Sequence, residues 1–63
     1  MDLVMEEKMY VVDFVYDHMV IQSWAVATNE DAAIDACLGT IAAECGQWAN
    51  DYLDIQVKRE ERI

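Results

Sequence analysis

The sequence predicts an α+β fold in which a three-stranded sheet carries one helix on one face. Residues 9–16 and 19–27 are rich in β-branched and aromatic side chains, which is typical of strands. Residues 29–49 place apolar side chains at intervals of three and four, which indicates an amphipathic helix. Residues 52–59 alternate apolar and polar side chains, as a half-buried strand does. The expected order is therefore β-β-α-β, within a single domain over residues 1–63.

The first two predicted strands flank a short reversal at Asp17-His18. Each strand divides its side chains between two faces, because successive residues point to opposite sides of a sheet. In the first strand one face carries Tyr10, Val12, Phe14 and Tyr16, and the other carries Met9, Val11, Asp13 and Val15. In the second strand one face carries Val20, Gln22, Trp24 and Val26, and the other carries Met19, Ile21, Ser23, Ala25 and Ala27. In the first strand Asp13 marks the more solvated face, whereas the pattern of the second strand leaves open which of its faces meets the helix.

The predicted helix begins after Thr28, whose hydroxyl can accept a hydrogen bond from the amide three residues on. Glu30 and Asp31 suit the positive end of the helix dipole. Gly46 could end the helix early in a left-handed conformation. We expect an end near Ala49 instead, because the apolar stripe continues to that point: Ile34, Cys37, Leu38, Ile41, Ala42, Cys45, Trp48 and Ala49.

The third predicted strand places Leu53, Ile55 and Val57 on one face. If it joins the sheet beside the first strand, the whole sheet is antiparallel, which we favour. If it joins beside the second strand, the helix becomes a parallel crossover. We expect residues 60–63 to form a charged, frayed tail and residues 1–8 an N-terminal extension.

Composition excludes several classes of function. The chain has 63 residues and a formal net charge of −9, which argues against direct contact with nucleic acid or an anionic membrane. There is no apolar run of membrane-spanning length and no basic start typical of a signal peptide, so the expected compartment is the cytoplasm. Cys37 and Cys45 lie eight positions apart in the predicted helix, too far for a disulfide, and are expected to be free thiols.

Catalytic chemistry is not indicated. His18 is the only histidine, and it lies in the predicted turn without a third group to orient it. No calcium loop, zinc pattern or glycine-rich phosphate loop is present. We therefore expect no catalytic residues, no metal and no cofactor, and we expect that the protein is not an enzyme.

More apolar side chains are present than one helix can cover. The uncovered sheet face must retain several large apolar residues, and monomers rarely expose large contiguous apolar patches. One explanation is that the N-terminal residues Leu3, Val4 and Met5 fold back over this face. The other is a homodimer or a surface for a protein partner, with Trp24 as the expected hot spot if it is exposed.

The charged residues in the central part of the chain are all acidic. No lysine or arginine occurs between Met9 and Val57, a stretch that contains eight acids. Such a surface speeds encounter with a basic partner, although it could also serve solubility alone. The candidate partner-binding residues are Asp13, Trp24, Glu30, Asp31, Asp35, Asp51 and Asp54.

In outline the chain resembles the small acidic proteins with which bacteriophages inhibit host systems, including anti-CRISPR proteins. The resemblance rests on the size, the charge, the hairpin at residues 9–27 and the strand-to-helix junction at residues 27–34. It implies stoichiometric inhibition of a basic, nucleic-acid-handling host complex in the bacterial cytoplasm, in some members by nucleic-acid mimicry. Two alternatives remain: a homo-oligomeric structural or adaptor module, and a sponge that binds a small molecule at a dimer seam.

Overall fold

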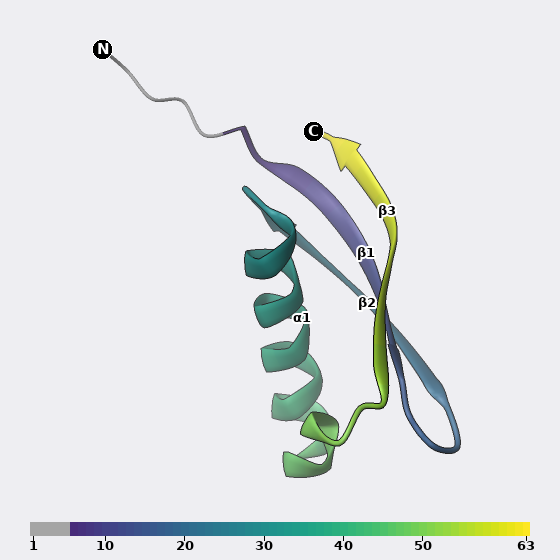
Figure 1. The fold of residues 1–63 in the computed structure, drawn as a ribbon. Helices are drawn as coiled ribbons and strands as arrows, with labels where there is room; N and C mark the ends of the chain where they lie inside the picture. Colours follow the sequence, from purple (N-terminus) through teal and green to yellow (C-terminus); the bar gives the residue numbers. More distant parts are fainter. Residues whose placement is uncertain (1–5) are drawn as a thin grey trace.

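A computed structural model describes residues 6–63 and shows an α+β fold with the predicted order of elements (Figure 1). Its elements are β1 (Lys8–Val15), β2 (Val20–Ala27), α1 (Glu30–Cys45), the short 3-10 helix η1 (Gln47–Asn50) and β3 (Asp54–Arg62). The strand order is β2-β1-β3, and both pairings are antiparallel. The third strand therefore joins beside the first, as we favoured, and α1 packs on one face of the sheet.

The β1–β2 hairpin turns at Asp17-His18, as predicted. The Tyr16 amide donates a 2.7 Å hydrogen bond to the Met19 carbonyl, which closes the two-residue turn. Neither turn residue has a positive φ. The register places Phe14 opposite Ile21 and Val11 opposite Trp24, so each pair of side chains shares one face of the sheet.

The structure decides which face meets the helix. The face of β1 that carries the aromatic residues is buried against α1, and the helix turns Ala33, Cys37 and Ile41 towards it. The small helix side chains leave room for the bulky rings below them. The resulting core consists of Tyr10, Val12, Phe14, Tyr16, Ala27, Ala33, Cys37, Ile41 and Ala49. The other face of the sheet is left without a covering element among residues 6–63.

The helix is capped by Asn29 and not by Thr28, which corrects the prediction. Asn29 has an extended backbone (φ −153°, ψ 170°), and its Oδ1 accepts a 2.8 Å hydrogen bond from the Ala32 amide. This places the cap one residue later than the sequence pattern indicated. Asparagine is at least as good a cap as threonine, so the local chemistry allows either residue.

The predicted helix end near Ala49 is wrong, because α1 ends at Cys45. Gly46 takes a positive φ of 90°, and its amide donates a 2.8 Å hydrogen bond to the Ala42 carbonyl. The chain then continues in η1, where Ala49 is buried and Trp48 is 43% exposed. The Tyr16 hydroxyl donates a 2.7 Å hydrogen bond to the Ala49 carbonyl, and this bond fixes η1 against the hairpin end of the sheet.

Strand β3 is shifted along the chain relative to the predicted range 52–59. It begins at Asp54, and Leu53 precedes it as an exposed side chain instead of sharing the buried face. A β-bulge interrupts its pairing with β1, because Val57 lies opposite Val12 whereas Arg59 lies opposite Val11. Lys58 is the extra residue, and the bulge lets the strand continue to Arg62.

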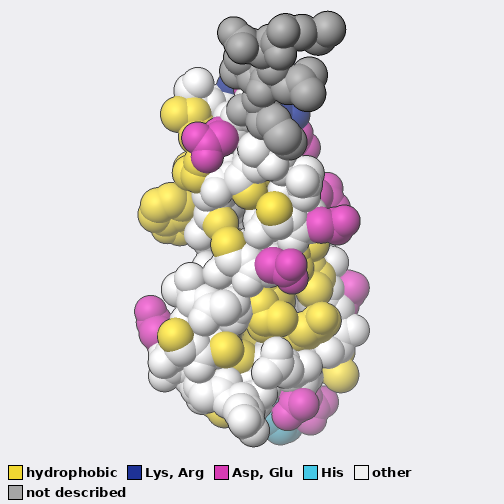
Figure 2. Space-filling view, turned by 90° about the vertical axis from the view of Figure 1, so that its left-hand side faces the viewer, with side chains coloured by type: hydrophobic (Ala, Val, Ile, Leu, Met, Phe, Trp, Pro, Cys, Tyr) yellow, Lys and Arg dark blue, Asp and Glu magenta, His cyan; other side chains and the backbone are white. Residues whose placement is uncertain are grey.

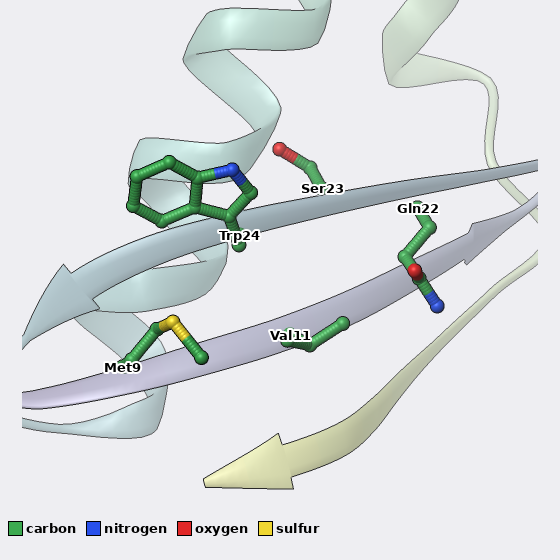
Figure 3. Close-up of a pocket in the computed structure, with 5 residues that line it drawn as sticks. All are labelled: Met9, Val11, Gln22, Ser23 and Trp24. Atoms are coloured by element: carbon green, nitrogen blue, oxygen red, sulfur yellow. The ribbon is translucent and has the colours of Figure 1, made fainter. Parts of the chain in front are cut away.

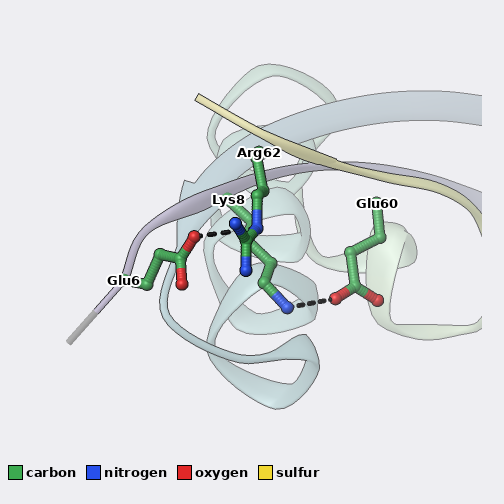
Figure 4. Close-up of polar contacts among 4 residues, drawn as sticks. All are labelled: Glu6, Lys8, Glu60 and Arg62. Carbon is green, nitrogen blue, oxygen red and sulfur yellow. Dashed lines mark hydrogen bonds and ion pairs between the residues drawn. The ribbon is translucent and has the colours of Figure 1, made fainter.

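The charged C-terminal residues do not form the frayed tail that we expected over residues 60–63. Residues 60–62 pair with β1, with Glu60 opposite Tyr10 and Arg62 opposite Lys8. Figure 4 shows the two ion pairs at this end of the sheet: Lys8 Nζ lies 2.7 Å from Glu60 Oε1, and Arg62 Nε lies 2.9 Å from Glu6 Oε1. These exposed ion pairs accompany the strand pairing, which continues to Arg62.

Two further observations concern the cysteines and the helix. Cys37 and Cys45 are free thiols, as expected.

Over residues 6–63, no helix has both the length and the apolar character needed to cross a membrane.

Candidate protein-binding surface

The sheet face opposite α1, called here the open face, is a regular grid of side chains. Its four rows run from β2 through β1 to β3 and follow from the strand register. From the hairpin end they are Val20–Val15–Asp54, Gln22–Asp13–Gln56, Trp24–Val11–Arg59 and Val26–Met9–Glu61. Apolar side chains therefore gather on β2 and β1, and polar or charged side chains gather on β3.

The apolar patch of the open face, defined by Met9, Val11, Trp24 and Val26, is the main feature of this surface. Trp24 is 66% exposed and Val26 is 42% exposed on β2, whereas Met9 and Val11, opposite them on β1, are half-buried. A shallow depression of about 240 Å³ lies here, and its lining also includes Gln22 and Ser23 (Figure 3). An indole beside such a depression is the arrangement that binding hot spots use.

Polar groups border the apolar patch on two sides. Towards the hairpin, Gln22 Nε2 donates a 2.9 Å hydrogen bond to Asp13 Oδ1. Towards β3, Arg59 Nη2 donates a 2.6 Å hydrogen bond to Glu61 Oε1 within an ion pair. An apolar centre with a polar border is the composition of a protein-binding surface.

Only three of the seven predicted site residues share this face. Trp24 lies in the apolar patch, Asp13 on its border, and Asp54 at the hairpin end of the β3 edge. The helix acids Glu30, Asp31 and Asp35 are exposed on the other side of the molecule. The structure therefore does not gather the predicted residues into one site.

The remaining acid, Asp51, lies in a second hollow at the hairpin end. This hollow of about 210 Å³ is lined by Tyr16, Asp17, His18, Met19, Trp48 and Asp51. His18 Nε2 is 3.3 Å from Asp17 Oδ2, and both side chains are exposed. The Trp48 ring packs edge-on to Tyr16 with centroids 5.2 Å apart, so this tryptophan is part of the local packing.

Acidic side chains occur on every part of the surface seen in Figure 2, at its upper and lower ends and along both sides. The lysine and arginine residues of the described chain lie in the half of the sheet away from the hairpin: Lys8, Lys58, Arg59 and Arg62. Because Asp13 and Asp54 lie on the open face, carboxylates occur on both faces of the sheet and are not gathered into one track.

The structure offers little for covalent or metal chemistry. Burial raises the pKa of the Cys37 thiol, although a hydrogen bond with Ser23 acts in the opposite direction. A raised pKa makes the thiolate scarce, so Cys37 is a poor nucleophile. No group of three or more potential metal ligands occurs in the part of the chain that the structure describes.

Sequence reasoning chose Trp24 as a site residue and named Met9, Val11 and Val26 only among the apolar residues that the uncovered sheet face could carry. The available signal was the alternation of side chains along a strand, since Val26 shares the face of Trp24 and Met9 shares the face of Val11. Joining the two strands required the hairpin register, which the structure supplies. The proposed cover by Leu3, Val4 and Met5 lies outside the described residues.

Comparison with known proteins adds no identification: no protein-family model, no curated protein and no solved structure matches this chain.

Proposed function

We propose that this chain is a non-enzymatic binding protein that docks its open face on a basic surface of a nucleic-acid-handling protein and blocks that surface. The observation that carries the proposal is the exposure of Trp24 within the apolar patch. An exposed indole in such a patch loses its water only when a partner covers it, which makes it a strong anchor.

The charge of the chain selects the kind of partner. With a net charge of −9, the molecule is repelled by acidic surfaces and attracted by basic ones. Proteins that handle nucleic acids present such basic surfaces to the phosphate backbone. Long-range attraction raises the rate of encounter, while the apolar patch provides the affinity once contact is made.

The distribution of the acids sets the form of inhibition that we propose. Carboxylates occur on both faces of the sheet, so the chain approaches a basic surface from many orientations and is held in one by Trp24. The proposal therefore relies on the open face for contact and on the whole charged surface for steering. In a bacteriophage setting this activity would inhibit a host complex, as the resemblance implies.

Capture from a bacterial lysate tests this proposal, with three versions of the chain immobilised in parallel: wild type, Trp24→Ala and Trp48→Ala. The matched Trp48 variant removes the same side chain from the second hollow. We expect mass spectrometry to find a basic protein that wild type and Trp48→Ala retain, that Trp24→Ala loses, and that added duplex DNA or RNA displaces. Equal retention by Trp24→Ala, or an interaction unaffected by nucleic acid, would contradict the proposal.

A further inference from the structure

We infer that β2 pairs edge to edge with the β2 strand of a second copy, joining the two sheets into one six-stranded antiparallel sheet. This inference rests on the backbone and charge of β2, and it stands whether or not the proposed basic partner exists.

The hairpin geometry shows which backbone groups of β2 are free. Tyr16 and Met19 are directly opposite each other and form a hydrogen-bonded pair. Hydrogen-bonded and non-hydrogen-bonded pairs alternate along an antiparallel ladder. The odd-numbered residues of β2 therefore bond to β1, and four residues direct their N–H and C=O groups outwards: Val20, Gln22, Trp24 and Val26.

These outward groups have no strand partner within residues 6–63, because β1 is the only neighbour of β2. Strand β2 also lacks the features that protect an edge, since its eight residues include no charge, no proline and no bulge. The opposite edge is different: β3 has a bulge at Lys58, and it carries charged residues at positions 54 and 58–62. One edge of the sheet is thus protected and the other is open.

The uncharged edge of β2 suits a second copy, because it is where two acidic chains can approach without placing carboxylates opposite each other. Two conditions limit the register: paired residues must share a face, and the outward groups must meet. Pairing around a two-fold axis at Ser23 satisfies both conditions. It places Val20 opposite Val26 of the second copy and Gln22 opposite its Trp24, and it uses all four outward residues of each strand.

The side chains of the open face suit this register. The Gln22 side chain is held towards β1 by its hydrogen bond to Asp13, whereas in Figure 3 the Trp24 indole lies on the other side of the β2 ribbon. Each indole can then lie over Gln22 of the other copy. The two Trp24 residues become diagonal neighbours, within reach of each other.

The helices also leave room for a second copy. Both would lie on the same face of the joined sheet, because a two-fold axis perpendicular to the sheet keeps its faces. The β2-α1-β3 connection is right-handed (Figure 1). In this arrangement, the residues one position before the buried helix residues Ala33, Cys37 and Ile41 face the free edge of β2. This flank carries exposed, small, uncharged residues: Ala32, Ala36, Gly39, Thr40 and Ala43.

The helix of a second copy can approach this flank closely. Nothing lies within 4 Å of a Cβ built on Gly39, and the Thr40 hydroxyl is already bonded to the Ala36 carbonyl at 3.1 Å. Small side chains allow two helices to pack at interaxial distances of about 8–10 Å. The pairing of β2 strands and the contact of the two helices are therefore compatible.

The most direct test is backbone amide hydrogen exchange on the full chain at micromolar and millimolar concentration. At millimolar concentration we expect protection to appear at the amides of Gln22, Trp24 and Val26, whereas those of Ile21, Ser23 and Ala25 are protected at both concentrations. Unprotected even-numbered amides in a millimolar sample would overturn the inference, as would a dimer that sediments with protection changes only elsewhere.

A matched pair of variants gives a second, independent readout by sedimentation equilibrium. Gln22 and Gln56 both lie opposite Asp13 on the open face, one on each edge strand. We expect Gln22→Glu to raise the dimer Kd about tenfold, because it brings carboxylates together at the two-fold axis. Gln56→Glu adds the same charge at the β3 edge and should leave the Kd nearly unchanged. Equal effects of the two variants, or a wild-type dimer that weakens as salt screens its repulsion, would contradict pairing through β2.

Discussion

Gln22 Nε2 donates a 2.9 Å hydrogen bond to Asp13 Oδ1 across the open face, joining β2 to β1 on the side opposite the helix. This bond divides the apolar side chains of that face into two groups. Trp24 and Val26 lie on one side of it, and Val15 and Val20 lie on the other. The bond therefore marks the border of the apolar patch and leaves the outer edge of β2 free of side-chain contacts from Gln22.

The two glycines should respond oppositely to alanine. Gly46→Ala forces a Cβ into a backbone with φ of 90°, and we expect a loss of about 1 kcal/mol in the free energy of unfolding. Gly39→Ala adds a methyl group in open space within α1, and we expect a gain of about 0.5–1 kcal/mol. Urea denaturation measures both values. A stabilising Gly46→Ala would show that α1 does not end as described.

The helix cap gives a second matched pair. Asn29→Ala removes the side-chain oxygen that accepts from the Ala32 amide, so we expect a loss of about 1 kcal/mol in the free energy of unfolding. Thr28→Ala should change that free energy by less than about 0.5 kcal/mol, since no hydrogen bond of its hydroxyl holds the helix. Thermal unfolding of the two variants checks the order. A larger loss in the free energy of unfolding for Thr28→Ala would show that Thr28 caps the helix, as the sequence pattern indicated.

Tyr16 links stability to alkaline pH. Burial raises the pKa of its phenol above the ordinary value, with smaller contributions from Cys45, Tyr52 and Asp51. Its contribution to stability is therefore complete below about pH 10, the pKa in the unfolded chain, and is lost as the pH rises through the higher folded value. Tyr16→Phe should lose about 1–3 kcal/mol at neutral pH, because the buried Ala49 carbonyl loses its donor.

Urea titrations of wild type and Tyr16→Phe at neutral and alkaline pH separate these two effects. We expect the wild type to lose stability more steeply above pH 10 than the variant does. The pKa of Lys8 is also raised, first by its hydrogen bond to Glu60, but Lys8 is present in both proteins and cancels in the comparison. Parallel alkaline curves for the two proteins would contradict the assignment to Tyr16.

Electrostatic steering predicts different effects for acids at different distances from the open face. Asp54→Lys changes a charge on that face, whereas Asp35→Lys changes one on the exposed side of α1. With the captured partner, both reversals should slow association and flatten its salt dependence, and Asp54 should have the larger effect, because charges beyond about 8 Å are largely screened at physiological salt. Stopped-flow association rates at several salt concentrations measure this order. Unchanged association rates would remove the electrostatic part of the proposal.

The elements with strong local patterns were predictable. The alternation in β1 and β2 and the polar reversal at Asp17-His18 fixed the hairpin to within a residue or so. Asp13 indicated the more solvated face of β1, and the structure confirms it, but the face of β2 that meets the helix was not predictable, because both of its faces are largely apolar. Tyr10 and Phe14 of β1, with Tyr16 directly after the strand, pack with the small helix residues Ala33 and Cys37 in one core, and this packing between segments far apart in the sequence decides the face.

The errors have two physical origins. At the end of α1, the apolar residues Trp48 and Ala49 continued the helical pattern, but the conformation of Gly46 ends the helix and places them in η1. At the C-terminus, the charged residues 60–62 had no local strand pattern, and they pair with β1 in a register that the bulge at Lys58 shifts by one residue. The exposure of Trp24 could be stated only once the helix-facing side was known.

The central claim is that Trp24 anchors a protein partner, and a binding titration of the captured partner tests it most directly. Wild type, Trp24→Ala and Trp48→Ala are each titrated, and the free energy of unfolding of each is measured. We predict that Trp24→Ala weakens binding about thirtyfold or more with nearly unchanged stability. Trp48→Ala should bind nearly as the wild type does and should be less stable, because its ring packs on Tyr16. Wild-type affinity in Trp24→Ala would contradict the claim.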